Sequence, residues 1–223
     1  MIGEDDNAEV LMKQGAWFDG PSKLEHISRE LLWFPGMSVL EVGTRPSSFE
    51  LAKDLSMKFF HLEMSAKQVE LSQAWASKQE VHAQVALWEE REEALAQWPV
   101  VDALVLRNVC GISMEELKQL LGKLSCPGNL LLVWPVRLQS VSEAWEKTWS
   151  QPLWTPNELL YHLHSLGLES TGFECCPFVP EGESSHALLK EVAEGVTEKD
   201  LLLTAYGLVA ATFHGSEDRV VRL

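Results

Sequence analysis

The sequence predicts an α/β domain with three layers, in which helices cover both faces of a mostly parallel sheet of seven strands. Strand-like and helix-like segments alternate from about residue 20 onward with short connections, which is typical of a parallel sheet. The segment 129–134 is almost entirely apolar, as expected of a parallel strand buried on both faces. The 223 residues are enough for one sizeable core. We therefore expect an N-terminal arm or lid over residues 1–20 and a single domain over 21–223.

The individual elements follow from local patterns. Short apolar runs between turn residues predict strands, and apolar residues three or four apart predict helices. The expected strands are 38–42, 58–63, 81–87, 101–107, 129–134, about 170–179 and about 206–213. The expected helices are 22–34, one beginning near 47, 65–78, 89–97, one beginning near 113, 155–167 and about 184–203.

Serine and threonine caps mark several helix starts. Ser47 and Ser65 begin the patterns S-x-x-E and S-x-x-Q, and Ser113 is followed by Glu at the third helical position. In such a capping box the hydroxyl accepts from a backbone N–H of the first turn. The segment 155–158 adds a proline at the first helical position, where its missing N–H costs nothing. These residues predict where four helices begin.

Acidic residues dominate the charge of the chain: 33 Asp and Glu stand against 18 Lys and Arg, giving a formal charge of -15. Nucleic-acid-binding proteins depend on clustered cations, and the sequence has no Lys/Arg-rich run, so we expect no nucleic-acid partner. No apolar run approaches the roughly 20 residues of a membrane span. With an acidic N-terminus, this predicts a cytoplasmic protein. Solubility is the favoured explanation of the charge, and a cationic substrate or basic partner protein is the alternative.

Cysteine, histidine and tryptophan spacing predicts packing rather than a metal site. No pair of cysteines has the spacing C-x-x-C, so free thiols are expected. His162 and His164 lie two apart on an expected helix and so do not face each other. Trp145 and Trp149 have helical i,i+4 spacing, and core packing is favoured over an aromatic cage or a lid. The segment 17–18, Trp followed by Phe, is a candidate lid.

Carboxylates and a glycine follow one another in an order that suits nucleotide binding. Glu41 ends the first expected strand just before Gly43, Glu63 ends the second, and Asp102 opens the fourth. In a doubly wound sheet, ligands bind beyond the carboxyl ends of the strands. A glycine there lets the backbone approach the ligand, and a carboxylate ending the second strand can accept two hydrogen bonds from a ribose diol. The pattern therefore indicates a nucleoside-binding site at this edge.

The ordered set of segments resembles the class I, Rossmann-like methyltransferases that use S-adenosylmethionine. The segment 39–44 is similar to their first motif, E/D-x-G-x-G-x-G, and 61–65 to their second, in which an acidic residue holds the ribose. Three later stretches resemble further motifs of the family. The segment 101–108 is similar to its F-D-x-V strand, and 127–132 is similar to its P-G-G-x-L-L turn. The segments 155–159 and 167–169 are similar to its T-P-x-E-L helix and the G-F-E that follows.

The resemblance implies S-adenosylmethionine as cofactor. It implies that Glu41 orients the network around the methionine amino group and that Glu63 binds the ribose hydroxyls. Met64 would pack on the adenine, and Trp88 would close the adenine pocket. The cofactor-binding residues that it implies are Glu41, Gly43, Thr44, Glu63, Met64, Trp88, Arg107 and Asn108. The last two would lie near the transferable methyl group.

The chain departs from the family at the glycine-rich loop. Arg45 and Ser47 stand where the family has its second and third glycines. A positive φ at Arg45 would cost about 1–2 kcal/mol more than with glycine, and Pro46 pushes Arg45 toward extended backbone.

These departures leave more than one function in view. The favoured hypothesis is an enzyme that transfers a methyl group to a small molecule, and we identify no general base and no metal ligand for it. The alternative is a non-catalytic protein of the same fold that acts as a partner subunit or regulator. A nicotinamide dehydrogenase is a weaker third, because G-x-G-x-x-G is absent after Gly43.

Overall fold

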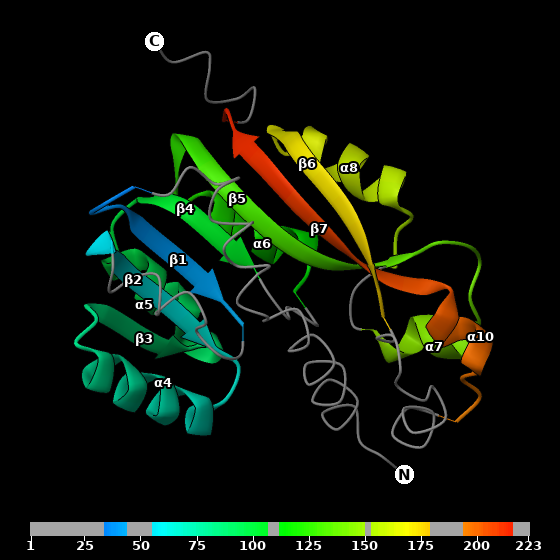
Figure 1. The fold of residues 1–223 in the computed structure, drawn as a ribbon, viewed down its shortest axis with the longest axis horizontal. Helices are drawn as coiled ribbons and strands as arrows, with labels where there is room; N and C mark the ends of the chain where they lie inside the picture. Colours follow the sequence, from blue (N-terminus) through cyan, green and yellow to red (C-terminus); the bar gives the residue numbers. More distant parts are fainter. Residues whose placement is uncertain (1–33, 44–54, 107–111, 150–152, 179–193, 216–223) are drawn as a thin grey trace.

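A computed structural model describes residues 34–43, 55–106, 112–149, 153–178 and 194–215 (Figure 1). They form a seven-stranded sheet in the order β3-β2-β1-β4-β5-β7-β6. The strands are β1 Ser38–Val42, β2 Lys58–Glu63, β3 Ala83–Leu87, β4 Val101–Leu106, β5 Leu124–Arg137, β6 Leu168–Pro177 and β7 Thr204–Phe213. The first five strands in this order, from β3 through β2, β1 and β4 to β5, are parallel to one another. Strand β7 runs antiparallel to both β5 and β6. The predicted fold class, a mostly parallel seven-stranded sheet flanked by helices, is confirmed.

The helices are short and mostly begin where the sequence predicts. They are α4 Ala66–Gln79, the 3-10 turn η2 Trp88–Glu90, α5 Arg91–Gln97, α6 Met114–Leu121, α7 Glu143–Thr148, α8 Pro156–Ser165 and α10 Glu198–Leu202. Ser113 and Thr155 form complete capping boxes, and the Ser65 hydroxyl accepts from the Gln68 N–H. These three predicted starts are confirmed. Within the described part of the chain, no helix is long and apolar enough to cross a bilayer.

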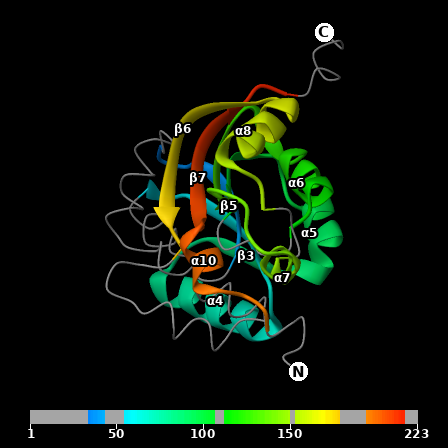
Figure 2. The ribbon, with the colours of Figure 1, turned by 90° about the vertical axis from the view of Figure 1, so that its right-hand side faces the viewer.

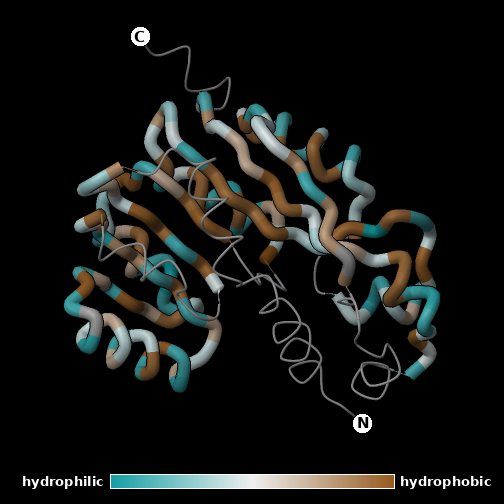
Figure 3. Tube along the Cα trace, viewed as in Figure 1, coloured by the Kyte–Doolittle hydropathy of each residue, from teal (hydrophilic) through white to brown (hydrophobic). Residues whose placement is uncertain are grey.

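Two cores lie on opposite faces of the sheet. Helices α5, α6 and α8 pack on one face, over alternate residues such as Leu40, Leu62 and Leu104. Helix α4 packs on the other face, over Val39 and Phe59. Figure 2 shows α5, α6 and α8 together on one side of the sheet, with α4 away from them. The inner strands are largely hydrophobic along their length (Figure 3), as burial on both faces requires.

A third cluster lies where α7 and α10 meet the ends of β5, β6 and β7. Trp145, Trp149 and Phe178 pack edge to face, and Tyr206 contacts Phe178. The indole N–H of Trp145 donates to Thr204 Oγ1 at 2.7 Å, which satisfies the polar atom of a fully buried ring. Core packing of the two tryptophans, rather than a cage or a lid, is confirmed.

Several predicted boundaries are wrong for local reasons. The helix expected over 184–203 does not include 194–197, because Gly195 has a φ of +93° and Thr197 caps α10. The strand expected over 81–87 begins at Ala83, since Val81 N–H bonds back to Ala76 at the end of α4. Strand β5 begins at Leu124 rather than 129, because Leu124 and Asn129 both pair with β4 and residues 125–128 bulge from that pairing.

Other boundaries differ by a few residues or cannot be compared. The 89–97 helix opens as the 3-10 turn η2, β6 begins at Leu168 and ends at Pro177, and β7 begins at Thr204. The expected arm over 1–20 with its candidate lid, the 22–34 helix and the helix start at Ser47 lie outside the described residues.

Candidate functional site

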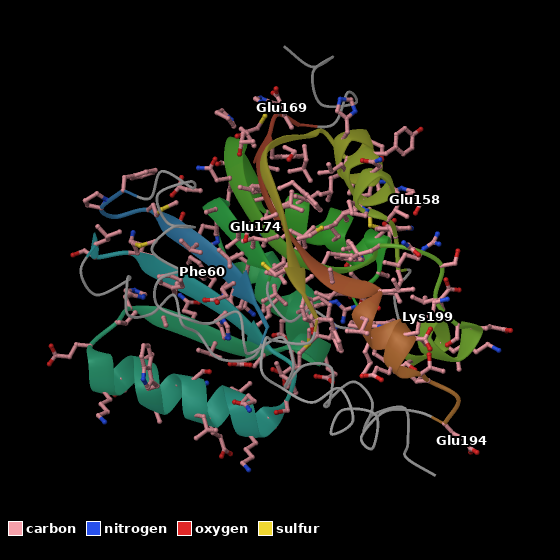
Figure 4. The ribbon with its side chains drawn as sticks, turned by 45° about the vertical axis from the view of Figure 1, so that its right-hand side comes forward. Phe60, Glu158, Glu169, Glu174, Glu194 and Lys199 are labelled. Atoms are coloured by element: carbon pink, nitrogen blue, oxygen red, sulfur yellow. The ribbon has the colours of Figure 1, made fainter. Side chains whose placement is uncertain are left out.

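The carboxyl ends of β1 and β2 bring the two predicted glutamates together. Glu41 pairs with His61 across the two strands, and Glu63 lies two residues beyond His61 on the same face. Gly43 N–H donates to the Leu62 carbonyl at 3.2 Å and so continues the pairing past the end of β1. In Figure 4, Phe60 marks β2 one residue before His61. The expected convergence of the two glutamates is therefore present.

His61 lies between the two carboxylates. Its Nε2 is 2.9 Å from Glu63 Oε1, and its Nδ1 is 3.9 Å from Glu41 Oε2. Glu41 has 1% of its surface exposed, and His61 and Glu63 have none. Buried polar groups need hydrogen-bond partners, and the imidazole lies within hydrogen-bond distance of Glu63 while it faces Glu41 across a longer gap.

Helix α4 adds a second donor to Glu63. Ser72, itself buried, donates its hydroxyl to Glu63 Oε1 at 2.5 Å. Both hydrogen bonds reach the same oxygen. Glu63 Oε2 is buried and has no hydrogen-bond partner among the described residues. A buried carboxylate oxygen without a partner is rare and points to a ligand donor.

Gly43 adopts backbone geometry that other residues disfavour. Its φ is +134°, within the range that side chains with a Cβ rarely occupy. The predicted need for glycine at this position is consistent with this conformation. Bare backbone therefore follows β1 directly beside the two carboxylates.

Met64 and Trp88 lie on the opposite face from Glu63. Both are partly buried against the core beneath α5 and α6. The Arg91 guanidinium lies 4.5 Å from the centre of the Trp88 ring and donates to the Trp88 carbonyl at 3.2 Å. It also pairs with Glu116 at 2.8 Å, and Glu116 completes the capping box of α6. Arg91 therefore ties the corner after β3 to the N-terminus of α6.

Replacing Arg91 with methionine is expected to lower the free energy of unfolding by about 1 kcal/mol, because a half-buried ion pair and a cation–π contact are lost together. Urea unfolding measures the change. Lys147→Met is the matched control: its pair with Glu143 is 2.6 Å long, but the two side chains are 73% and 80% exposed, so little change is expected. Equal losses in the two variants would contradict the assigned role of Arg91.

Asp102 serves a structural role at the amino ends of the strands, opposite to the end that carries Glu41 and Glu63. Its carboxylate accepts from Ser38 N–H and from the Ser38 hydroxyl, both at 2.8 Å. Both residues lie at the amino ends of their strands, away from Glu41 and Glu63. The aspartate of the F-D-x-V-like strand therefore fixes β4 against β1.

Not every predicted site residue can be placed. Thr44, Arg107 and Asn108 lie outside the described residues, as do Arg45, Pro46 and Ser47. Sequence reasoning missed Ser72 and Arg91. Ser72 falls seven residues after a helix cap, on the face of α4 that packs on the sheet, and helical spacing from Ala76 could have indicated this.

The remaining chemistry-bearing groups are placed elsewhere. A hollow of about 330 Å³ lies between β3 and α5, lined by residues that include Gln84, Glu93 and Trp98, and so is separate from Glu63. His162 stacks on Trp154 with ring centres 4.3 Å apart, and His164 is exposed. No cluster of His, Cys, Asp and Glu among the described residues could hold a metal ion.

Comparison with known proteins gives likeness in structure alone. No family model matches the sequence. No curated protein matches it either. Among solved structures, a SAM-dependent methyltransferase from Geobacter sulfurreducens in complex with S-adenosylhomocysteine matches with a TM-score of 0.62 and 15% identity, over 86% of this chain and 90% of that chain.

Two further structures show what this fold carries elsewhere. A geranyl diphosphate C-methyltransferase from Streptomyces coelicolor matches with a TM-score of 0.61 and 14% identity, over 86% of this chain and 80% of that one. The [4+2]-cyclase SpnF matches with a TM-score of 0.61 and 15% identity, over 85% of this chain and 78% of that one. The chain therefore has the Rossmann-like fold of the class I S-adenosylmethionine-dependent methyltransferases.

Proposed function

We propose that this protein binds S-adenosylmethionine and transfers its methyl group to a small molecule. The single observation that carries the proposal is the buried Glu63 carboxylate, which keeps one oxygen without a partner at the carboxyl end of β2. Ribose hydroxyls are donors that suit this oxygen. Gly43, with its positive φ, is hydrogen-bonded to Leu62, the residue before Glu63, and suits close approach of a ligand to the backbone.

The residues of this chain would bind and orient the cofactor. Glu63 would accept from the ribose, and Glu41 would orient the network around the methionine amino group. Met64 and Trp88 would pack around the adenine, and by resemblance Thr44, Arg107 and Asn108 would complete the pocket. The cofactor supplies an electrophilic methyl group on a sulfonium. Orientation of the acceptor then provides much of the rate acceleration.

A specific observation favours the alternative, a non-catalytic partner subunit or regulator. Glu63 has no exposed surface and already bonds to His61 and Ser72. A ligand must therefore gain access to a carboxylate that the protein itself has enclosed. The [4+2]-cyclase among the structural neighbours also illustrates that this fold supports more than methyl transfer.

Calorimetric titration with S-adenosylhomocysteine separates the two functions. The proposal expects saturable binding with a Kd in the micromolar range, and no binding at millimolar ligand would support the partner subunit. A titration with NADH under the same conditions serves as the control for a dehydrogenase. We also propose that the described elements belong to a single domain whose partners are a small molecule or a protein, and not nucleic acid, given the formal charge of -15.

A further inference from the structure

We infer that the outer edge of β3 binds an extended, basic segment of a partner protein, which adds a strand to the sheet there. This interaction goes beyond the proposed function. It needs no cofactor, and the hollow between β3 and α5 lies on the opposite face of the sheet from Glu63. Three features support it: an open strand edge, the hollow beside that edge, and the negative charge around the hollow.

Strand β3 has one free edge. It is the end strand of the sheet, and among the described residues only β2 pairs with it. The Phe59 N–H donates to the His82 carbonyl at 3.0 Å, and the direction of the backbone groups alternates from there along β3. The N–H and C=O groups of Ala83, Val85 and Leu87 therefore point away from β2, toward the position of a further strand.

The edge of β3 lacks the features that usually prevent pairing with another chain. Natural edge strands carry charged side chains, a proline or a β-bulge. The sequence of β3, AQVAL, contains no charged residue and no proline, and its pairing with β2 runs from Ala83 to Leu87 without a register shift. Regular edges of this kind bind extended peptides through main-chain hydrogen bonds.

The hollow beside the edge suits a long basic side chain. Its volume is about 330 Å³, and its lining combines the buried side chains of Ala94 and Trp98 with the exposed side chains of Glu90, Glu93 and Gln97. Lysine and arginine have an apolar stem and a charged end. The stem would pack on the buried apolar side chains, while the charged end would reach the exposed carboxylates.

The charge around the hollow is negative, and the one arginine of this segment already has a partner. Residues 88–97, which form η2 and α5, contain four glutamates and one arginine. Arg91 pairs with Glu116 at 2.8 Å and lies over the Trp88 ring. Because complementary charge favours association and selects the partner, a basic segment fits this surface and an acidic one does not.

The first test is fluorescence anisotropy of the full chain with a labelled peptide of alternating lysine and threonine. We expect saturable binding with a Kd in the micromolar range. A peptide of alternating glutamate and threonine should bind at least about 10-fold more weakly. Equal affinities, or no binding of the lysine peptide, would overturn the inference. The proposed function would still stand, because no cofactor takes part in this measurement.

Backbone methylation of the lysine peptide tests the addition of a strand. In a paired strand, alternate N–H groups point toward β3 and the others point away from it. One peptide is methylated on the backbone nitrogen of every lysine, and a second on that of every threonine. Their Kd values should differ by at least about 10-fold, because only one of the two loses its hydrogen bonds to β3. Equal Kd values would mean that charge alone holds the peptide, and would overturn the inference.

The double variant Glu90→Gln with Glu93→Gln tests the carboxylates of the hollow. Exposed ion pairs are individually weak, so the two changes together should weaken binding of the lysine peptide by about 3- to 10-fold. Glu143→Gln with Glu146→Gln is the matched control, because it removes the same charge from exposed positions on α7, away from β3 (Figure 1). The control should bind as the wild type does. Equal weakening in both would show that net charge governs binding, and would overturn the inference.

A second copy of this chain is the competing occupant of the edge. Pairing two copies through β3 would bring two acidic surfaces together, and each copy has a formal charge of -15, so the basic segment is favoured. Sedimentation of the chain alone distinguishes the two occupants. The wild type and Glu90→Gln with Glu93→Gln should have the same sedimentation coefficient. A dimer that this double variant strengthens would assign the edge to a second copy and overturn the inference.

Discussion

Replacing Asp200 with alanine is expected to lower the free energy of unfolding by about 3–5 kcal/mol, because four hydrogen bonds to a buried carboxylate are lost at once. Asp200 accepts from the backbone N–H groups of Ser142 and Thr197 at 2.6 and 2.8 Å and from both hydroxyls at 3.0 and 2.7 Å. It thereby joins α7 to α10. Urea unfolding followed by tryptophan fluorescence measures the loss.

Lys199→Ala is the control for Asp200, because Lys199 is the preceding residue on α10 and is exposed (Figure 4). It should change the free energy of unfolding by less than about 0.5 kcal/mol. A loss of similar size in both variants would show that any substitution in α10 is destabilising. The hydrogen bonds to the Asp200 carboxylate would then not explain the effect.

The stability that Asp200 contributes should depend on pH. Burial opposes ionisation and is the largest single influence on the pKa of Asp200, but the hydrogen bonds from Ser142 and Thr197 together outweigh it and lower that pKa. A lowered folded-state pKa gives stability that is fully present above the unfolded value of about 3.9 and lost as pH falls through the folded value. The difference in free energy of unfolding between the wild type and Asp200→Asn should therefore become smaller as the pH falls through the folded-state pKa. A gap that widens as pH falls would contradict this assignment.

Replacing Glu63 with glutamine is expected to weaken S-adenosylhomocysteine binding by about 10- to 100-fold, because a charge-assisted hydrogen bond becomes a neutral one. Glutamine keeps the size of the side chain, so the effect falls on the ligand more than on the fold. Calorimetry measures the affinity, and a thermal scan checks that the variant is folded.

Glu70→Gln provides the matched control for Glu63. It removes the same charge from the N-terminal half of α4, where the side chain is exposed. Its affinity for S-adenosylhomocysteine should equal that of the wild type. Equal weakening in both variants would mean that net charge, and not the Glu63 contact, governs binding.

The order of the elements was predictable because each carries its own local cause. Caps at Ser113 and Thr155 set helix starts, and continuous apolar runs set buried strands. The bulge at 125–128 was not predictable, since it depends on pairing Leu124 with Val101 across the sheet. The Pro-Gly pair at 127–128 predicts a turn. No local signal shows that β5 pairs with β4 both before and after this pair.

The candidate site was predictable in position and not in detail. Strand ends placed Glu41 and Glu63 at one edge, because parallel neighbours end together. The alternation of strand residues placed His61 on the same face as Glu63. The donor on α4 depends on how that helix lies against the sheet, so the Ser72 contact emerges only from tertiary structure.

The place of β7 between β5 and β6 constrains the order in which a newly synthesised chain can assemble. Among the described residues, β6 is paired along its length with β7 alone, yet β6 leaves the ribosome first. At about 5–20 residues per second, β6 waits on the order of seconds with both of its edges open. The five parallel strands can form in that interval. Completion of the sheet therefore awaits the translation of β7, and a pause before it would prolong the exposure of an unpaired strand edge to other chains.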